Sequence, residues 1–262
     1  MARDATRRFS GRSEHYVRHR PHYPREVVTI LEREIGLAAD WPIADVGSGT
    51  GISAELFLEN GNTLYGVEPN ADMRAAAERR FSDEPRFRSV AGSAEATGLP
   101  ANSVDLVVAA QAFHWFDAER TRTEFMRILR RDGWVVLIWN KRIIDTTPFL
   151  RAYEDLLMHF GTDYAEIRHD CRRPAVIEQF FGGPFRKRVL HTEQVLDLEG
   201  LRGRLLSTSY IPAPDRPEHA AMLHRLDEVF RDTAIDGRVR FDYDVELYWG
   251  HLATIAREGS EA

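Results

Sequence analysis

Residues 43–52, which read Ile-Ala-Asp-Val-Gly-Ser-Gly-Thr-Gly-Ile, constrain the fold of this chain more than any other stretch. An apolar run over residues 41–46 leads into glycines at alternate positions, and a helix-compatible segment, residues 52–60, follows them. Glycine accepts positive φ and lets a ligand approach the backbone, while the free N–H groups of the next helix point toward the same place. The pattern therefore predicts a strand, a glycine-rich turn and a helix that together face a ligand.

A second apolar run, residues 63–67, ends in an acidic residue, Glu68, which Pro69 follows. A carboxylate at the tip of the second strand can accept hydrogen bonds from both hydroxyls of a ribose. Asp45 stands just before the first glycine, within reach of the backbone amides of the turn. D-x-G-x-G-x-G followed by an acidic second-strand tip resembles class I S-adenosylmethionine-dependent methyltransferases. The resemblance implies S-adenosyl-L-methionine as the cofactor and S-adenosyl-L-homocysteine as the product.

Strand and helix patterns alternate five times up to residue 139, which predicts a parallel sheet in an α/β fold. These strands are expected at residues 41–46, 63–67, 87–91, 104–110 and 134–139, the last after a turn at 130–133. Alternating patterns at residues 186–195 and 238–248 predict two more strands. The resemblance implies a Rossmann-like, seven-stranded, mostly parallel sheet with helices on both faces and an antiparallel last strand. We expect residues 1–262 to form a single domain of this type.

The alternation breaks twice, and there we expect a helical cap that forms the substrate pocket. Residues 141–184 hold two helical patterns, 147–160 and 175–181, and residues 197–235 hold two more. We expect the cap to choose the acceptor.

The N-terminal residues 1–24 are rich in arginine and histidine, with Phe9, Tyr16 and Tyr23 interleaved. Their pattern F-x6-Y-x3-RP-x-YP resembles the N-terminal lid of a small-molecule methyltransferase subgroup that includes trans-aconitate methyltransferase-like proteins. A solvated basic tail is the plain alternative, and contact with single-stranded nucleic acid is another.

The third strand runs into Gly92-Ser93-Ala94-Glu95, where the family usually has Gly-Asp-Ala with the acid reading the adenine amino group. Here Ser93 stands in place of that acid. Ser93, the Ala94 backbone N–H and Glu95 are all candidates for the adenine contact. For Glu95 the alternative is a solvated loop residue.

The fourth strand delivers Gln111-Ala112-Phe113-His114-Trp115-Phe116. Ligands of open α/β sheets bind beyond the carboxyl ends of the strands, so this segment should border cofactor and substrate. Core packing explains Phe113 and Phe116 equally well. It explains Gln111 and His114 less well, because buried polar groups need partners.

The expected reaction is methyl transfer to a small-molecule acceptor through O- or N-methylation, with a carboxylate among the candidate acceptors. S-adenosylmethionine carries its own electrophile, so the protein mainly supplies alignment and exclusion of water. His114 is the candidate base where the nucleophile must lose a proton. Arg20 is the candidate clamp for a carboxylate acceptor. The expected cofactor contacts are Tyr16, Asp45, Gly47, Ser48, Gly49, Gly51, Glu68, Pro69, Ser93, Ala94, Glu95 and Gln111.

Composition excludes several other classes. A net charge of −6 argues against a general nucleic-acid binder, and no apolar run approaches the ~18 residues that span a bilayer. The ten histidines are scattered and Cys171 is the one cysteine, so neither a metal site nor an internal disulfide is expected. We expect a cytoplasmic monomer or homodimer.

Two rival functions remain. A nicotinamide-dependent oxidoreductase would need G-x-G-x-x-G, but counting from Gly47 the last glycine is replaced by Ile52. A catalytically idle scaffold could still bind the cofactor, because the glycines and Glu68 are intact. Methyl transfer to an acceptor would distinguish the enzyme from the scaffold.

Overall fold

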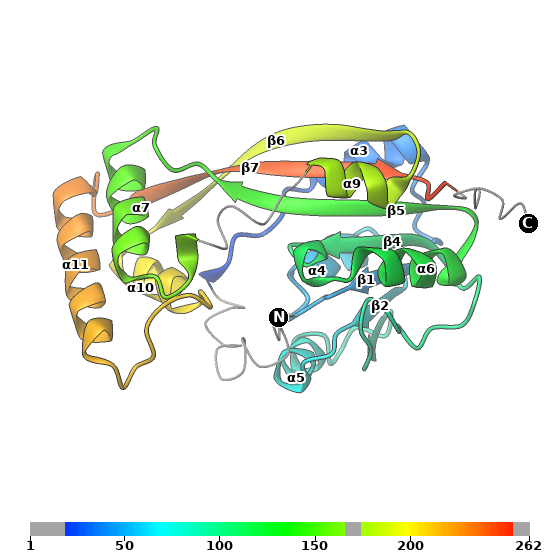
Figure 1. Ribbon diagram of the computed structural model, residues 1–262, viewed down its shortest axis with the longest axis horizontal. Helices are drawn as coiled ribbons and strands as arrows, with labels where there is room; N and C mark the ends of the chain where they lie inside the picture. The colour runs from blue at the N-terminus through cyan, green and yellow to red at the C-terminus, as the bar shows by residue number, and fades with distance from the viewer. Residues whose placement is uncertain (1–18, 166–173, 254–262) are drawn as a thin grey trace, which may run out of the picture.

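A seven-stranded sheet, in the order β3-β2-β1-β4-β5-β7-β6, organises the computed structural model, which describes residues 19–165 and 174–253 (Figure 1). Its strands are β1 (Ile43–Val46), β2 (Leu64–Val67), β3 (Phe87–Val90), β4 (Val104–Ala110), β5 (Leu129–Arg142), β6 (Phe185–Leu196) and β7 (Val239–Gly250). Strands β1 to β5 pair in parallel, and β7 runs antiparallel to both of its neighbours, β5 and β6. The predicted mostly parallel sheet with an antiparallel last strand is confirmed.

Helices cover both faces of the sheet, because successive residues of each strand point to opposite sides. On one face, α3 (Glu26–Ile35) and α4 (Ile52–Glu59) share a buried apolar cluster with Ile43. On the other face, α6 (Ala118–Ile128) and α9 (Pro174–Phe181) share a cluster with the next residue, Ala44. The helix α5 (Ala71–Arg80) follows β2. The strands that carry the glycine turn are thus buried from both sides, as their continuous apolar runs predict.

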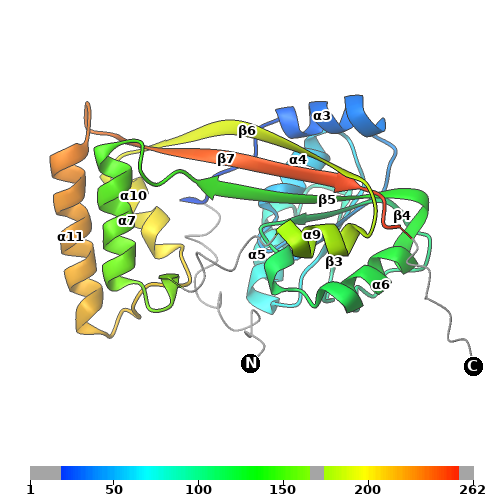
Figure 2. The same ribbon diagram turned by 45° about the horizontal axis from the view of Figure 1, so that its top comes forward.

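The strands β5, β6 and β7 extend well past the rest of the sheet and carry a second group of helices (Figure 2). This group, which we name the helical cap, consists of α7 (Pro148–Phe160), α10 (Leu198–Leu206) and α11 (Pro217–Thr233). It has its own apolar core, in which α7, α10 and α11 pack against Val239, Phe241 and Tyr243 of β7. The helix α9 lies inside the range predicted for a cap but packs Ile177, Phe180 and Phe181 on the sheet.

The strand β5 begins earlier than its sequence pattern predicts. The expected turn at residues 130–133 lies within the strand, where the pairing jumps from Val104–Leu129 to Leu106–Trp134. Asp132 takes a positive φ of 64° there, so the turn residues form an irregularity in a strand that continues on both sides. Pairing with β4 therefore outweighs the local turn preference.

Candidate functional site

The three glycines of the turn all adopt positive φ, at 71° for Gly47, 57° for Gly49 and 82° for Gly51. They differ in what surrounds them. A Cβ on Gly47 would lie 2.6 Å from the Cβ of Ala112, and one on Gly51 would overlap the ring of Phe81. These two glycines let other parts of the protein approach the turn.

At Gly49 the backbone is least covered. A Cβ there would have a single neighbouring heavy atom within 4 Å, the Cε of Met73 at 3.7 Å, among the described residues. Of the three glycines, Gly49 is therefore the one over which a ligand could lie against the backbone.

The amides of Gly47 and Ser48 both donate to the carbonyl of Val67, at 2.8 and 3.2 Å. These bonds pin the turn to the end of β2. The Ser48 backbone is thus used to shape the site.

Glu68 joins the turn to the tip of β2. Its Oε2 accepts from the N–H of Gly49 at 3.0 Å, and its Oε1 accepts from the N–H of Asn70 at 2.8 Å. Burial raises the pKa of the Glu68 carboxyl, and the two backbone bonds oppose that shift. Each carboxylate oxygen can accept a further bond, so the side chain can still bind a pair of hydroxyls. The neighbouring Pro69 is exposed.

Asp45 is fully buried below the turn. Its Oδ2 accepts from the Ser53 hydroxyl at 2.7 Å, and its Oδ1 has no hydrogen-bond partner among the described residues. Burial raises the pKa of the Asp45 carboxyl to about 7, and the nearby Glu68 adds to the shift. Two buried carboxyl groups therefore lie at this end of the site.

The loop after β3 holds the candidates for the adenine contact. Ser93 and Ala96 exchange backbone hydrogen bonds of 3.1 and 3.3 Å, which form a tight turn around the buried Ala94. The Glu95 Oε1 accepts from the N–H of Asp117 at 3.0 Å, at the start of α6. Glu95 thus ties the loop to the start of α6.

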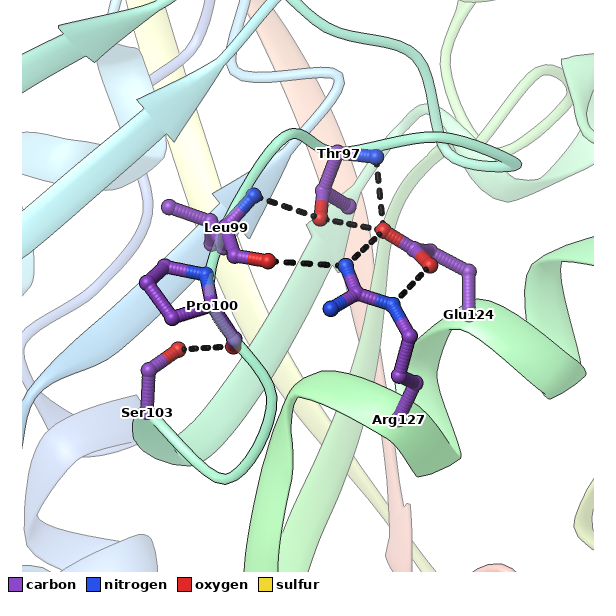
Figure 3. Close-up of polar contacts among 6 residues, drawn as sticks. All are labelled: Thr97, Leu99, Pro100, Ser103, Glu124 and Arg127. Carbon is purple, nitrogen blue, oxygen red and sulfur yellow. Dashed lines mark hydrogen bonds and ion pairs between the residues drawn. The ribbon is translucent and has the colours of Figure 1, made fainter.

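The next part of the same loop is fixed by an ionic network (Figure 3). The Glu124 carboxylate on α6 accepts from the N–H and the hydroxyl of Thr97 and pairs with Arg127. Arg127 also donates to the carbonyl of Leu99 at 2.8 Å. The bonds from Arg127 lower the pKa of the Glu124 carboxyl to about 2. The loop therefore rests on a network whose charges are paired.

The segment after β4 begins with Gln111 at a positive φ of 54°, which few residues other than glycine adopt. Its N–H donates to the carbonyl of Ile138 at 2.8 Å, and its Nε2 donates to the carbonyl of Asn140 at 3.0 Å. Such backbone strain clusters at functional sites, and here it aims the chain across the end of β5.

Phe113 is buried and packs edge-on against Trp139, whereas Phe116 is half-buried beside the same cluster. The core-packing interpretation therefore holds for Phe113. His114 lies on the single-turn helix η1 (Phe113–Trp115), half-buried, with its ring 4.9 Å from that of Trp115.

Residues 19–21 lie between the cap and the strand ends. Arg20 donates from Nη2 to the carbonyl of Ser207 at 2.8 Å, after α10. The carbonyl of His19 accepts from the Gln194 side chain at 2.9 Å, and that of Pro21 accepts a long 3.5 Å bond from Asn140. Arg20 is thus next to the cap. Tyr16 and Phe9 lie outside the described residues.

Sequence reasoning missed three largely buried polar residues at the cap: Arg142 at the end of β5, Tyr153 on α7 and Arg204 on α10. A signal existed for Arg204, because it lies between Leu201 and Leu205 on the apolar face of α10. A charged residue in such a stripe marks a buried position with a specific partner.

Over residues 19–165 and 174–253, no three His, Cys, Asp or Glu side chains gather as a metal site would require. Within the same ranges, no helix combines the length and the apolar character that crossing a membrane demands.

Part of this chain is similar to methyltransferases. Residues 44–137 match the family model of a methyltransferase domain. An uncharacterized methyltransferase of Mycobacterium tuberculosis (strain ATCC 25618 / H37Rv) is 35% identical over 140 residues, which are 53% of this chain and 55% of the relative. The chain thus spans about half the length of the curated relatives it matches.

Solved structures support the fold. A structure named for a type II methyltransferase from Anaeromyxobacter dehalogenans superposes with a TM-score of 0.63 and 23% identity, covering 89% of this chain and 98% of its own. A geranyl diphosphate methyltransferase solved with S-adenosylmethionine has a TM-score of 0.50 and 14% identity, covering 87% of this chain and 84% of its own. At these identities the likeness establishes the Rossmann-like fold alone, as the sequence predicts.

Proposed function

We propose that this protein transfers a methyl group from S-adenosyl-L-methionine to a small-molecule acceptor, by O- or N-methylation. The observation that carries the proposal is the Glu68 carboxylate, which is buried at the β2 tip and bonded to the amide of Gly49. It belongs to the segment that matches a methyltransferase domain, residues 44–137.

The residues of the turn fit this cofactor. Glu68 would accept both ribose hydroxyls, since each of its oxygens has capacity beyond its backbone bond. The uncovered backbone at Gly49 would take the part of the cofactor that crosses the turn. Asp45, whose Oδ1 has no partner among the described residues, would face its positive charge. For the adenine contact Ser93, the Ala94 N–H and Glu95 are the candidates, and Glu95 still has acceptor capacity beyond its bond from Asp117.

When bound, the cofactor supplies an electrophilic methyl group on a sulfonium. The chain's own residues must then align the acceptor and exclude water. His114, just beyond β4, would take the proton of a hydroxyl or ammonium acceptor. Residues 1–24 would act as a lid, since their described part contacts both the cap and Asn140. Deleting them should lower turnover while circular dichroism still reports a folded sheet.

Membership of the trans-aconitate methyltransferase-like subgroup stays a prediction. It rests on the N-terminal motif, most of which precedes the described residues, and no relative named above carries that description.

Calorimetric titration with S-adenosylhomocysteine tests the proposal. Glu68→Ala should weaken binding by about 1–3 kcal/mol, because it removes charge-assisted bonds to the ribose. Glu59→Ala, an exposed change at the end of α4, is the matched control and should bind like the parent. Equal affinity in Glu68→Ala would show that the ribose lies elsewhere.

Two further measurements separate the rivals. NADH should not bind, and clear binding would revive the oxidoreductase. Transfer of a labelled methyl group to any member of a panel of carboxylates, phenols and amines would exclude the idle scaffold.

A further inference from the structure

Two arginines lie buried in the helical cap, Arg142 at the end of β5 and Arg204 on α10. The side chain of Arg142 is 11% exposed, and Arg204 as a residue is 7% exposed. Arg142 is paired through Nη2 with the Glu154 carboxylate and also donates to the Tyr164 hydroxyl at 2.8 Å. One of the two cations thus has a carboxylate beside it.

Arg204 has no such partner. Its Nε donates to the Tyr243 hydroxyl at a long 3.4 Å, and its guanidinium lies 5.9 Å from the ring centre of Phe241. Within residues 19–165 and 174–253, no carboxylate forms a hydrogen bond or ion pair with it. Burying a charge without a counter-charge costs several kcal/mol, so this arrangement is expensive for the protein alone.

Three hydrogen-bond donors around these two guanidinium groups have no acceptor among the described residues. The Nη1 of Arg142, the Nη1 of Arg204 and the hydroxyl of Tyr153 are buried and lack a hydrogen-bond partner among the described residues. The Tyr153 ring connects them, because it lies 5.0 Å from the Arg142 guanidinium and 4.8 Å from the ring of Phe241. Burial raises the pKa of Tyr153, so its hydroxyl is neutral and can donate. All three groups can donate a hydrogen bond, and the two guanidinium groups cannot accept one.

A group that only accepts hydrogen bonds and carries negative charge would complete this cluster, and a carboxylate or phosphate has both properties. We propose that Arg142, Tyr153 and Arg204 bind an oxyanion of the methyl acceptor, so that the acceptor is an anionic small molecule. This inference rests on the proposed function for the identity of the ligand as an acceptor. The oxyanion binding itself can be measured without it.

The cluster is connected to the end of the site where the methyl group would be transferred. Gln111, just after β4, bonds to Asn140, and Arg142 is the next residue on the same face of β5. Ile138 pairs with Ala110 at the end of β4, and Arg142 follows four residues later, which is roughly 13 Å along a strand. The oxyanion would thus anchor one end of the acceptor at the cluster, and the atom that is methylated would lie toward the opposite end.

Residues 19 and 20, the first described residues of the chain, contact the same place. Arg20 bonds to the carbonyl of Ser207, whose hydroxyl donates to the carbonyl of Arg204 at 2.7 Å. Tyr243 and Gln194 continue the chain of contacts from Arg204 to His19. A segment that covers the acceptor site would rest on the oxyanion cluster.

Thermal-shift and calorimetric titrations of the full chain with succinate, its neutral diamide and inorganic phosphate test the inference. Succinate, phosphate or both should bind at millimolar concentration and raise the melting temperature, whereas the diamide should do neither. A response to succinate alone identifies a carboxylate as the anionic group that binds to the cluster, and one to phosphate alone identifies a phosphate ester. If no oxyanion binds to the parent, the inference is wrong.

Substitutions test whether the oxyanion binds at the arginine cluster. Arg204→Met should weaken oxyanion binding by at least about tenfold and should raise the melting temperature in anion-free buffer, because it removes an unpaired buried charge. A purely structural arginine would instead lower that temperature when replaced. Arg202→Met on the same helix is the control, since Arg202 is half-exposed and paired with Asp227. It should leave oxyanion binding unchanged.

Tyr153→Phe keeps the ring and removes only the hydroxyl. This variant tests the cluster if Arg204→Met does not fold. It should weaken oxyanion binding several-fold, and parent-like affinity would overturn the inference. All variants should bind S-adenosylhomocysteine like the parent. Failure of the parent to bind S-adenosylhomocysteine would defeat the proposed function alone, because oxyanion binding is measured without it.

Discussion

The two ends of the site bury ionisable groups of opposite type. At the glycine turn the buried groups are carboxyls, Asp45 and Glu68, and in the cap they are the guanidinium groups of Arg142 and Arg204. Among the described residues, the Oδ1 of Asp45 at one end and the Nη1 atoms of the two arginines at the other lack a hydrogen-bond partner. The Glu124–Arg127 network nearby differs, because its charges are paired within the protein.

This contrast gives a way to separate binding groups from structural ones. A buried charge that is paired stabilises the fold without a ligand, while a buried charge left incomplete is stabilised when a ligand arrives. The acidic end suits a cofactor with a positive sulfonium, and the basic end suits an anionic acceptor. The methyl group would then move along a site that is negative at one end and positive at the other.

The largest expected effect is at His114, on the single-turn helix just beyond β4. For a hydroxyl or ammonium acceptor, His114→Ala should lower kcat by roughly 10²–10⁴-fold, because a general base is lost. For a carboxylate acceptor, which is already ionised at neutral pH, kcat should change little. In that case Arg20→Ala should raise KM instead. Single-turnover kinetics with the acceptor found in the panel would decide. No effect of either change on kcat or KM would remove both residues from the active site.

The next largest effect is the pH dependence of stability that arises from Asp45, at the glycine turn. The pKa of Asp45 is raised to about 7 by burial, so between pH 4 and 7 the folded protein holds a proton that the unfolded chain releases. Stability from this group is therefore full below about pH 4 and is lost as the pH rises to 7. The loss is on the order of 4 kcal/mol for about three pH units.

Denaturant unfolding of the parent and Asp45→Asn at pH 5 and pH 8 measures this difference. The asparagine cannot ionise, so its stability should fall less between the two pH values. Identical pH dependence in both proteins would mean that Asp45 is not a buried acid of raised pKa.

The smallest effect is expected where the charges are paired. Glu124→Ala should destabilise the fold by about 1–3 kcal/mol, because the Thr97 amide and Arg127 lose their acceptor. The depressed pKa of Glu124 predicts that its contribution is present above about pH 4.5 and is lost as the pH falls toward 2.

Urea titrations should show this loss for Glu124→Ala and no loss for Glu119→Ala, an exposed position on the same helix. If Glu124→Ala were as stable as the parent, the claim that paired charges stabilise this fold without a ligand would be wrong.

The parts of the fold that the sequence predicted are those set by local spacing. The glycine turn, the acidic tip at Glu68 and the run of strands follow from short patterns of apolar and glycine residues. The start of β5 was not predicted by such patterns. The Asp132-Gly133 pair favours a turn, but pairing with β4 keeps these residues within the strand as an irregularity. The hydrogen bond between Glu95 and Asp117 was not predicted either, because its partners are 22 residues apart in the sequence.

The arginine cluster shows the same limit more strongly. Arg142 and Arg204 meet around Tyr153 only because β5, α7 and α10 converge in the cap. No pattern within one segment reports such a convergence. The apolar stripe of α10 marks Arg204 as buried, but it does not indicate which residues surround it.

The position of β7 has a consequence for how the chain folds. It follows β5 and β6 in the sequence yet lies between them, and these two strands pair with β7 on either side. Its first half fills the core of the cap, and its second half, with Val245 and Leu247, fills the core of the sheet. Neither core can close before β7 has been synthesised and inserted, and its pairing with β5 spans about a hundred residues of chain. The cap and the sheet should therefore become protected from hydrogen exchange together, in one late step of folding.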